Sequence, residues 1–123
     1  MSSGNLGADT VMYSNEEIMQ FVNLVAEAVD PDRIILFGSY AYGNPDSKSD
    51  IDLLVIKNGK DFSVDDEAEL ATVVFFRRMQ RKINLRYDMF FQTENQAQRV
   101  AENGGAFVDA LQRGRVVYER THQ

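Results

Sequence analysis

The chain has 123 residues, of which 44% are hydrophobic and 26% are charged, a composition typical of one globular domain with its own core. It has no cysteine, which excludes disulfides and thiolate zinc sites, and no apolar run of about 18 residues, which argues against a membrane span. The formal net charge of −6 repels polyanions, so broad nucleic-acid binding is disfavoured.

Residues 1–12 are predicted to form a flexible leader. The stretch MSSGNLGADT is rich in serine and glycine, and it lacks the basic start and the apolar segment of a secretion signal. We therefore expect a single domain over residues 13–120 and, by default, a cytoplasmic location.

The first half of the domain is predicted to hold one helix and two strands. Ser14 and Glu17 have the form of a capping box, and apolar residues then recur every three or four positions up to about Val29. The apolar run 33–37 is expected to be a buried strand, and a second strand is expected over 51–56. The loop 43–49 between them is dense in turn residues.

The second half continues the alternation of helices and strands. We expect a helix over 64–81, a strand over 85–91, a helix over 94–103 capped by Thr93, a helix over 106–113 and a strand over 115–119. Together these elements predict an α/β or α+β fold in which helices pack on a small sheet. In the helix over 64–81 the candidate buried residues are Leu70, Val73, Val74, Phe75 and Phe76.

Asp50 and Asp52 lie at the start of the second strand. Side chains alternate across a strand, so the two carboxylates point to the same face and repel each other unless a cation lies between them. A hard ion such as Mg²⁺ prefers one or two carboxylates together with substrate phosphates and water. Alone, the pair also fits an acidic surface turn.

Gly38 and Ser39 follow the first strand directly. Backbone N–H groups and a hydroxyl at such a turn are donors for a phosphate, and glycine lets a phosphate approach without a clashing Cβ. The polar loop that follows brings the second strand back beside the first. The sequence therefore predicts a phosphate site next to the two aspartates.

Asp88 lies inside the otherwise apolar segment LRYDMFF. A carboxylate there carries a desolvation cost unless it is paired or ligated. It fits a third oxygen ligand beside Asp50 and Asp52. The alternative is an edge strand in which Asp88 meets water or pairs with an arginine such as Arg86.

The stretch GSYAYGNPDSKSDID resembles the signature of the DNA polymerase β-like nucleotidyltransferase superfamily, in which Gly-Ser, ten residues and Asp-x-Asp follow one another. The resemblance is to its small, single-domain members, the minimal nucleotidyltransferases (MNT). The strand YDMFF and the tail GGAFVDALQRGRVVYER are also similar to that family. The resemblance implies a small mixed sheet flanked by helices.

The resemblance also implies a role for each residue of the motif. Gly38 and Ser39 would hold the β- and γ-phosphates of a nucleoside triphosphate, Asp50 and Asp52 would ligate two Mg²⁺ ions, and Asp88 would complete the first metal site and help activate an attacking hydroxyl. Attack on the α-phosphorus would transfer a nucleoside monophosphate, AMP where ATP is the substrate, and release pyrophosphate.

One segment departs from the family pattern. Many relatives carry arginines where this chain reads Tyr40-Ala41-Tyr42. Tyrosine can hydrogen-bond or stack on a base, but it cannot neutralise a phosphate. Packing of the two rings on the sheet and contact with a ligand therefore both stay open.

The expected partners also follow from the resemblance. Small members are commonly encoded beside a helical protein of the HEPN type, and some are antitoxins that adenylylate a tyrosine on that toxin. We expect the same here, because the chain lacks a domain to bind an acceptor. A homo-oligomer is a further option. The alternatives are an antitoxin that only masks its partner through exposed phenylalanines, and transfer to a small molecule.

Overall fold

The computed structural model describes residues 12–58 and 63–121, and its centre is a four-stranded mixed sheet. The strand order is β3-β2-β1-β4. β1 is antiparallel to both β2 and β4, whereas β2 and β3 are parallel. The strands are β1 Arg33–Phe37, β2 Ile51–Ile56, β3 Tyr87–Gln92 and β4 Arg115–Glu119. The α/β architecture with a small mixed sheet is confirmed.

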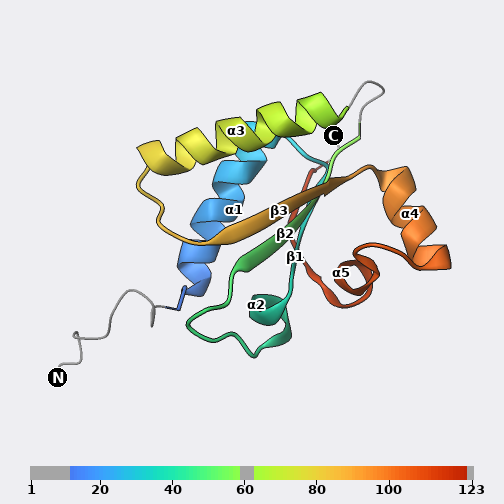
Figure 1. Cartoon of the computed structure of the whole chain (residues 1–123), viewed down its shortest axis with the longest axis horizontal. Helices are drawn as coiled ribbons and strands as arrows, with labels where there is room; N and C mark the ends of the chain where they lie inside the picture. Colours follow the sequence, from blue (N-terminus) through green and yellow to red (C-terminus); the bar gives the residue numbers. More distant parts are fainter. Residues whose placement is uncertain (1–11, 59–62, 122–123) are drawn as a thin grey trace.

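The helices cover the sheet on both faces (Figure 1). α1 and α3 lie together on one face, and α3 is also the crossover that the parallel pair of β2 and β3 requires. α4 and α5 lie on the other face, and the short α2 follows β1. The helices are α1 Asn15–Val29, α2 Ser39–Tyr42, α3 Val64–Gln80, α4 Glu94–Asn103 and α5 Val108–Arg113. No helix in these described ranges is long and apolar enough to cross a membrane.

Local sequence signals explain where most helices begin. Ser14 caps α1 and Thr93 caps α4, each in a complete capping box. α1 ends where Asp30 adopts a left-handed conformation. The helix expected from residue 106 begins only at Val108, because Phe107 is itself left-handed, with φ 67°. The predicted leader lies outside the described residues except for Met12, which is exposed.

Two apolar clusters hold the layers together. The larger one joins α1 to β1 and β2, with Phe21, Leu36 and Leu53 fully buried. The smaller one lies under α4 and α5 and includes Ile35, Leu54 and Ala97. Because neighbouring residues of a strand face opposite ways, β2 supplies buried side chains to both clusters and reads as a nearly continuous apolar run.

The expectation that Phe75 and Phe76 are buried in the core is wrong. Their side chains are 44% and 57% exposed, whereas Val74 is fully buried. On a helix, residue 76 lies about 200° around the axis from residue 74, so the two cannot face the same neighbour. α3 packs against the larger cluster through Leu70 and Val74, which leaves both phenylalanines on the outer side.

Candidate active site

Asp52 and Asp88 meet at the boundary between two strands. They are direct register partners in the parallel pair of β2 and β3, so their side chains leave the same face of the sheet, the face of α4 and α5. Asp52 is half-buried and Asp88 is exposed. The structure therefore brings these two predicted residues together, although they are 36 positions apart in the sequence.

The pKa of Asp52 is strongly shifted by its surroundings. Burial, and after it the negative charges of Asp88 and Asp50, together raise the pKa of its carboxyl to about 6. A nearby cation would stabilise the ionised form of Asp52, because it would offset the negative charges of Asp88 and Asp50. These oxygens are also the ligand type that Mg²⁺ prefers, so the donor set fits a hard divalent ion.

Asp50 is engaged by an arginine and not by Asp52 or Asp88. Arg86, just before β3, donates from Nε to Oδ1 of Asp50 at 3.0 Å. The same guanidinium donates to the carbonyls of Ser47 and Ser49 at 2.9 and 3.1 Å, and it lies over the ring of Tyr13. Arg86 thus fixes the loop before β2 and supplies the counter-charge of Asp50.

The predicted cluster of three carboxylates is correspondingly incomplete. In the described residues, no group of three acidic or histidine side chains is arranged closely enough to hold one metal ion. Asp52 and Asp88 are neighbours, while Asp50 is engaged by Arg86. A metal bound here would have the Asp52–Asp88 pair as its ligands, while Oδ1 of Asp50 is taken up by Arg86.

Gly38 closes the site from the end of β1. Its φ of 75° and ψ of −162° belong to a region that is essentially restricted to glycine. A Cβ at this position would overlap Oδ2 of Asp52, so the turn and the carboxylate lie in direct contact. Ser39 comes next, at the start of α2. The expected proximity of the Gly-Ser turn to the aspartates is therefore present.

Tyr40 and Tyr42 both have protein partners. The ring of Tyr40 stacks on Tyr13 with centroids 5.8 Å apart, and its hydroxyl accepts from the Tyr13 N–H. The hydroxyl of Tyr42 donates to Oδ2 of Asp109 in α5 at 2.8 Å. Desolvation and this bond to Asp109 raise the pKa of Tyr42. Tyr40 packs against the larger core cluster, whereas Tyr42 is held by α5 and not by the sheet. Contact of either ring with a ligand stays a prediction.

Tyr42 also brings a cation to α2. The guanidinium of Arg113 lies 4.1 Å from the centre of the Tyr42 ring, a cation–π geometry, and its Nη1 is 3.5 Å from Oδ1 of Asp109. Positive charge therefore lies against Tyr42, three residues after Ser39, although α2 contains no arginine. The contact of Arg113 with Tyr42 and the link of Arg86 to Asp50 were not predicted, since both depend on tertiary contacts.

Comparison with known proteins gives a family match and a similar solved structure. Residues 18–103 match the family model described as a nucleotidyltransferase domain. The fold is similar to a crystal structure described as that of a "putative nucleotidyltransferase" from Sulfolobus solfataricus, with a TM-score of 0.56 and 22% identity. The match covers 85% of this chain and 79% of that one. No curated protein matches the sequence.

Proposed function

The chain belongs to the nucleotidyltransferase domain family, and on that premise we propose that it transfers AMP from ATP, with Mg²⁺, to a hydroxyl of a partner protein. The observation that carries the proposal is the contact of Gly38 with Asp52 beside Asp88. A triphosphate held at the glycine turn would have its α-phosphorus next to Asp52, whose pKa is raised to about 6.

The roles of the residues follow from their positions. Gly38 and Ser39 bind the outer phosphates, because the glycine leaves the backbone open and the serine adds a hydroxyl. Asp52 and Asp88 would hold Mg²⁺, which when bound would supply neutralisation of charge on the phosphates and on the attacking oxygen. Asp88 is the more exposed of the two and faces the incoming hydroxyl, whose proton it is placed to accept.

The acceptor is proposed to be a helical protein of the HEPN type, with this chain as its antitoxin. The outer side of α3 supports a protein partner: Phe75, Phe76 and Met79 are each about half exposed and lie within one and a half turns. The guanidinium of Arg78 lies over the ring of Phe75, 5.2 Å from its centre. Exposed apolar side chains beside this cation suit a helical surface with apolar and acidic side chains, which the proposed partner would have to present.

The decisive test is labelling of the product of the neighbouring gene with α-labelled ATP and Mg²⁺. We expect label on that protein with the wild type, loss of at least 100-fold in rate with Asp52→Asn, and no change with Glu16→Gln, an exposed acid-to-amide control in α1. A folded wild type that labels nothing while binding the same partner would overturn the proposal.

A second function, masking without catalysis, is favoured by one observation. Asp50 is held by Arg86, so the three carboxylates of the motif are not assembled as one ligand group. If masking is the function, an Asp50→Asn, Asp52→Asn double variant still neutralises the partner. Phe76→Asp would then abolish neutralisation, whereas catalysis predicts that the double variant fails.

A further inference from the structure

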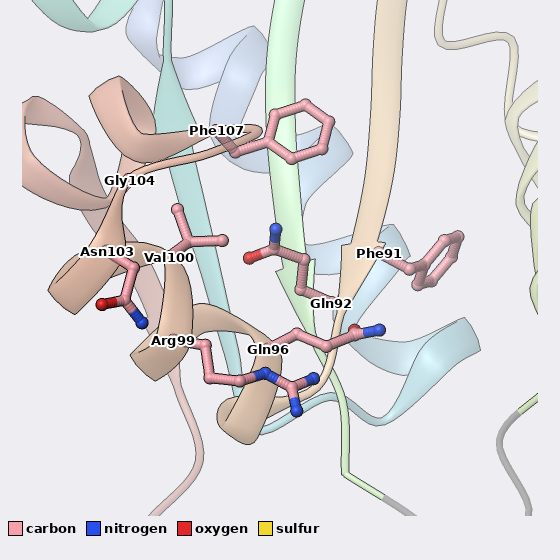
Figure 2. A pocket seen from close by; sticks show the side chains of 8 residues that line it. All are labelled: Phe91, Gln92, Gln96, Arg99, Val100, Asn103, Gly104 and Phe107. Atoms are coloured by element: carbon pink, nitrogen blue, oxygen red, sulfur yellow. The ribbon is translucent and has the colours of Figure 1, made fainter.

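A groove lies on the same face of the sheet as Asp52 and Asp88, further along β3. It has a volume of about 410 Å³ and is bounded by the end of β3, by α4 and by the loop that leads to Phe107 (Figure 2). The site described above uses none of its lining residues. The groove is therefore distinct from the carboxylate site, although it lies on the same face of the sheet.

The amide of Gln92 lies in the middle of this groove (Figure 2). Gln92 is only 8% exposed, and its Nε2 donates to the carbonyl of Ala106 at 3.4 Å. Its Oε1 is buried and accepts no hydrogen bond from any described residue. If the amide were flipped, Oε1 of Gln92 would face the carbonyl oxygen of Ala106, and both are acceptors. The orientation is therefore fixed, and Oε1 is the atom that lacks a hydrogen-bond donor.

A buried acceptor without a donor is costly, by roughly 1–3 kcal/mol, and such groups are uncommon in folded proteins. A ligand that donates a hydrogen bond at this position would remove the cost. The charged residue that lines the groove is Arg99, and no acid lines it. A ligand of this groove should therefore be uncharged or negatively charged, and it should carry hydrogen-bond acceptors that Arg99 can donate to.

An aromatic surface connects the groove to the carboxylates. Phe37 is the register partner of Asp52, and Phe90 lies two residues beyond Asp88 on the same face. The ring of Phe107, which lines the groove, is 4.8 Å from that of Phe90 and 6.1 Å from that of Phe37, centre to centre. Such rings form a surface on which a planar base can stack.

The spacing along β3 suits a nucleotide. Gln92 follows Asp88 by four residues on the same face, which is roughly 13 Å along the strand. A ribose and a purine ring can span this length from an α-phosphorus held at the carboxylates. The groove then receives the base while the phosphates stay at Gly38.

We propose that this groove binds the base of the nucleotide and that Gln92 Oε1 accepts a hydrogen bond from the exocyclic amine of adenine. Amides of glutamine are suited to adenine, which offers an amine donor beside ring-nitrogen acceptors. Hypoxanthine carries a carbonyl oxygen in place of that amine and would face Oε1 with a second acceptor. The inference rests on the proposed nucleotidyl transfer and adds to it the residue that selects adenine over other bases.

The experiment compares ATP with ITP, which lacks the exocyclic amine, by calorimetric titration of the whole chain with Mg²⁺. We expect the wild type to bind ATP about tenfold more tightly, the value of one good hydrogen bond. Gln92→Leu should bind both nucleotides with equal affinity. Gln98→Leu, the same change at an exposed position of α4 outside the groove, should keep the preference.

The base site can also be tested on the wild type alone, by NMR. Titration with adenosine should shift the side-chain amide signals of Gln92 in nitrogen–proton NMR spectra, and inosine should shift them far less. Equal affinity of the wild type for ATP and ITP, with transfer of both, would overturn the base site but leave the proposed function intact. Failure to bind any nucleotide would overturn both.

Discussion

The face of the sheet under α1 and α3 and the face under α4 and α5 are packed very differently. Among the described residues, thirteen buried side chains form the cluster on the first face, and five form the cluster on the second. The second face carries instead the carboxylate pair, the exposed ring of Phe90 and the groove around Gln92. Stability and chemistry are thus divided between two sides of the same strands.

Removing one aromatic ring from each face tests that division. Phe21→Ala should lower the free energy of unfolding by about 3–5 kcal/mol, because Phe21 is completely buried. Phe90→Ala should cost less than about 1.5 kcal/mol, because its side chain is 37% exposed. Urea unfolding followed by circular dichroism measures both, and equal losses would contradict the division.

Gly38→Ala affects the junction between the two faces. An alanine must adopt the glycine-only conformation, which costs about 1–3 kcal/mol, and its Cβ must displace the carboxylate of Asp52. We expect the melting temperature to fall and transfer activity to fall by more than tenfold. Gly43→Ala, also at positive φ but with open space around its Cβ, is the control. It should lose stability without that loss of activity.

Asp52→Asn, a substitution on the less packed face, should stabilise the folded protein at neutral pH. The pKa of Asp52 is raised from 3.8 to about 6, so the folded state holds this proton more tightly than the unfolded chain does. The resulting stabilisation is present below about pH 4 and is lost as pH rises to about 6. Since Asp52 is partly exposed, solvent screening reduces the effect, and we expect the variant to melt roughly 3 °C higher than the wild type at pH 7.5.

Melting curves between pH 4 and 8 measure this difference. The gap between Asp52→Asn and the wild type should be small at pH 4 and reach its full size above pH 6. Glu16→Gln provides the baseline for loss of one exposed negative charge. A constant gap over the whole range would show that the burial of Asp52 does not strain the folded protein.

Arg86→Met should have the smallest effect. Its ion pair with Asp50 is exposed on both sides, and such pairs contribute about 0–1 kcal/mol. The variant also loses the bonds to Ser47 and Ser49, so the loop before β2 should exchange its amide hydrogens faster. Hydrogen exchange detects that change. Unaltered exchange in the loop would mean that Arg86 does not fix it.

Local features of the sequence predicted most of the fold. The caps at Ser14 and Thr93 marked helix starts because a capping box lies within four residues. β2 was recognisable because its apolar residues are adjacent in the sequence, with Asp52 as the one acidic residue among them. The burial of Phe75 and Phe76 was misjudged because apolar residues at 73–76 point around the whole helix. Only the position of α1 decides which of them is covered.

The site was predictable as a set of residues but not as a geometry. The motif named Gly38, Asp52 and Asp88, and the register of β2 with β3 brings the last two together. The partner of Asp50 depends on Arg86, 36 residues away, and that of Tyr42 on Asp109, 67 residues away. Contacts so distant in sequence follow from the packing of α5 and β3, which no local pattern encodes.

The crossover through α3 has a consequence for the newly made chain. The strand with Asp88 can join β2 only after the 17 residues of α3 have been made. A chain that ends within α3 would still hold the strands β1 and β2 with Gly38 and Asp52, but it would lack Asp88. We therefore expect a product truncated before β3 to be inactive.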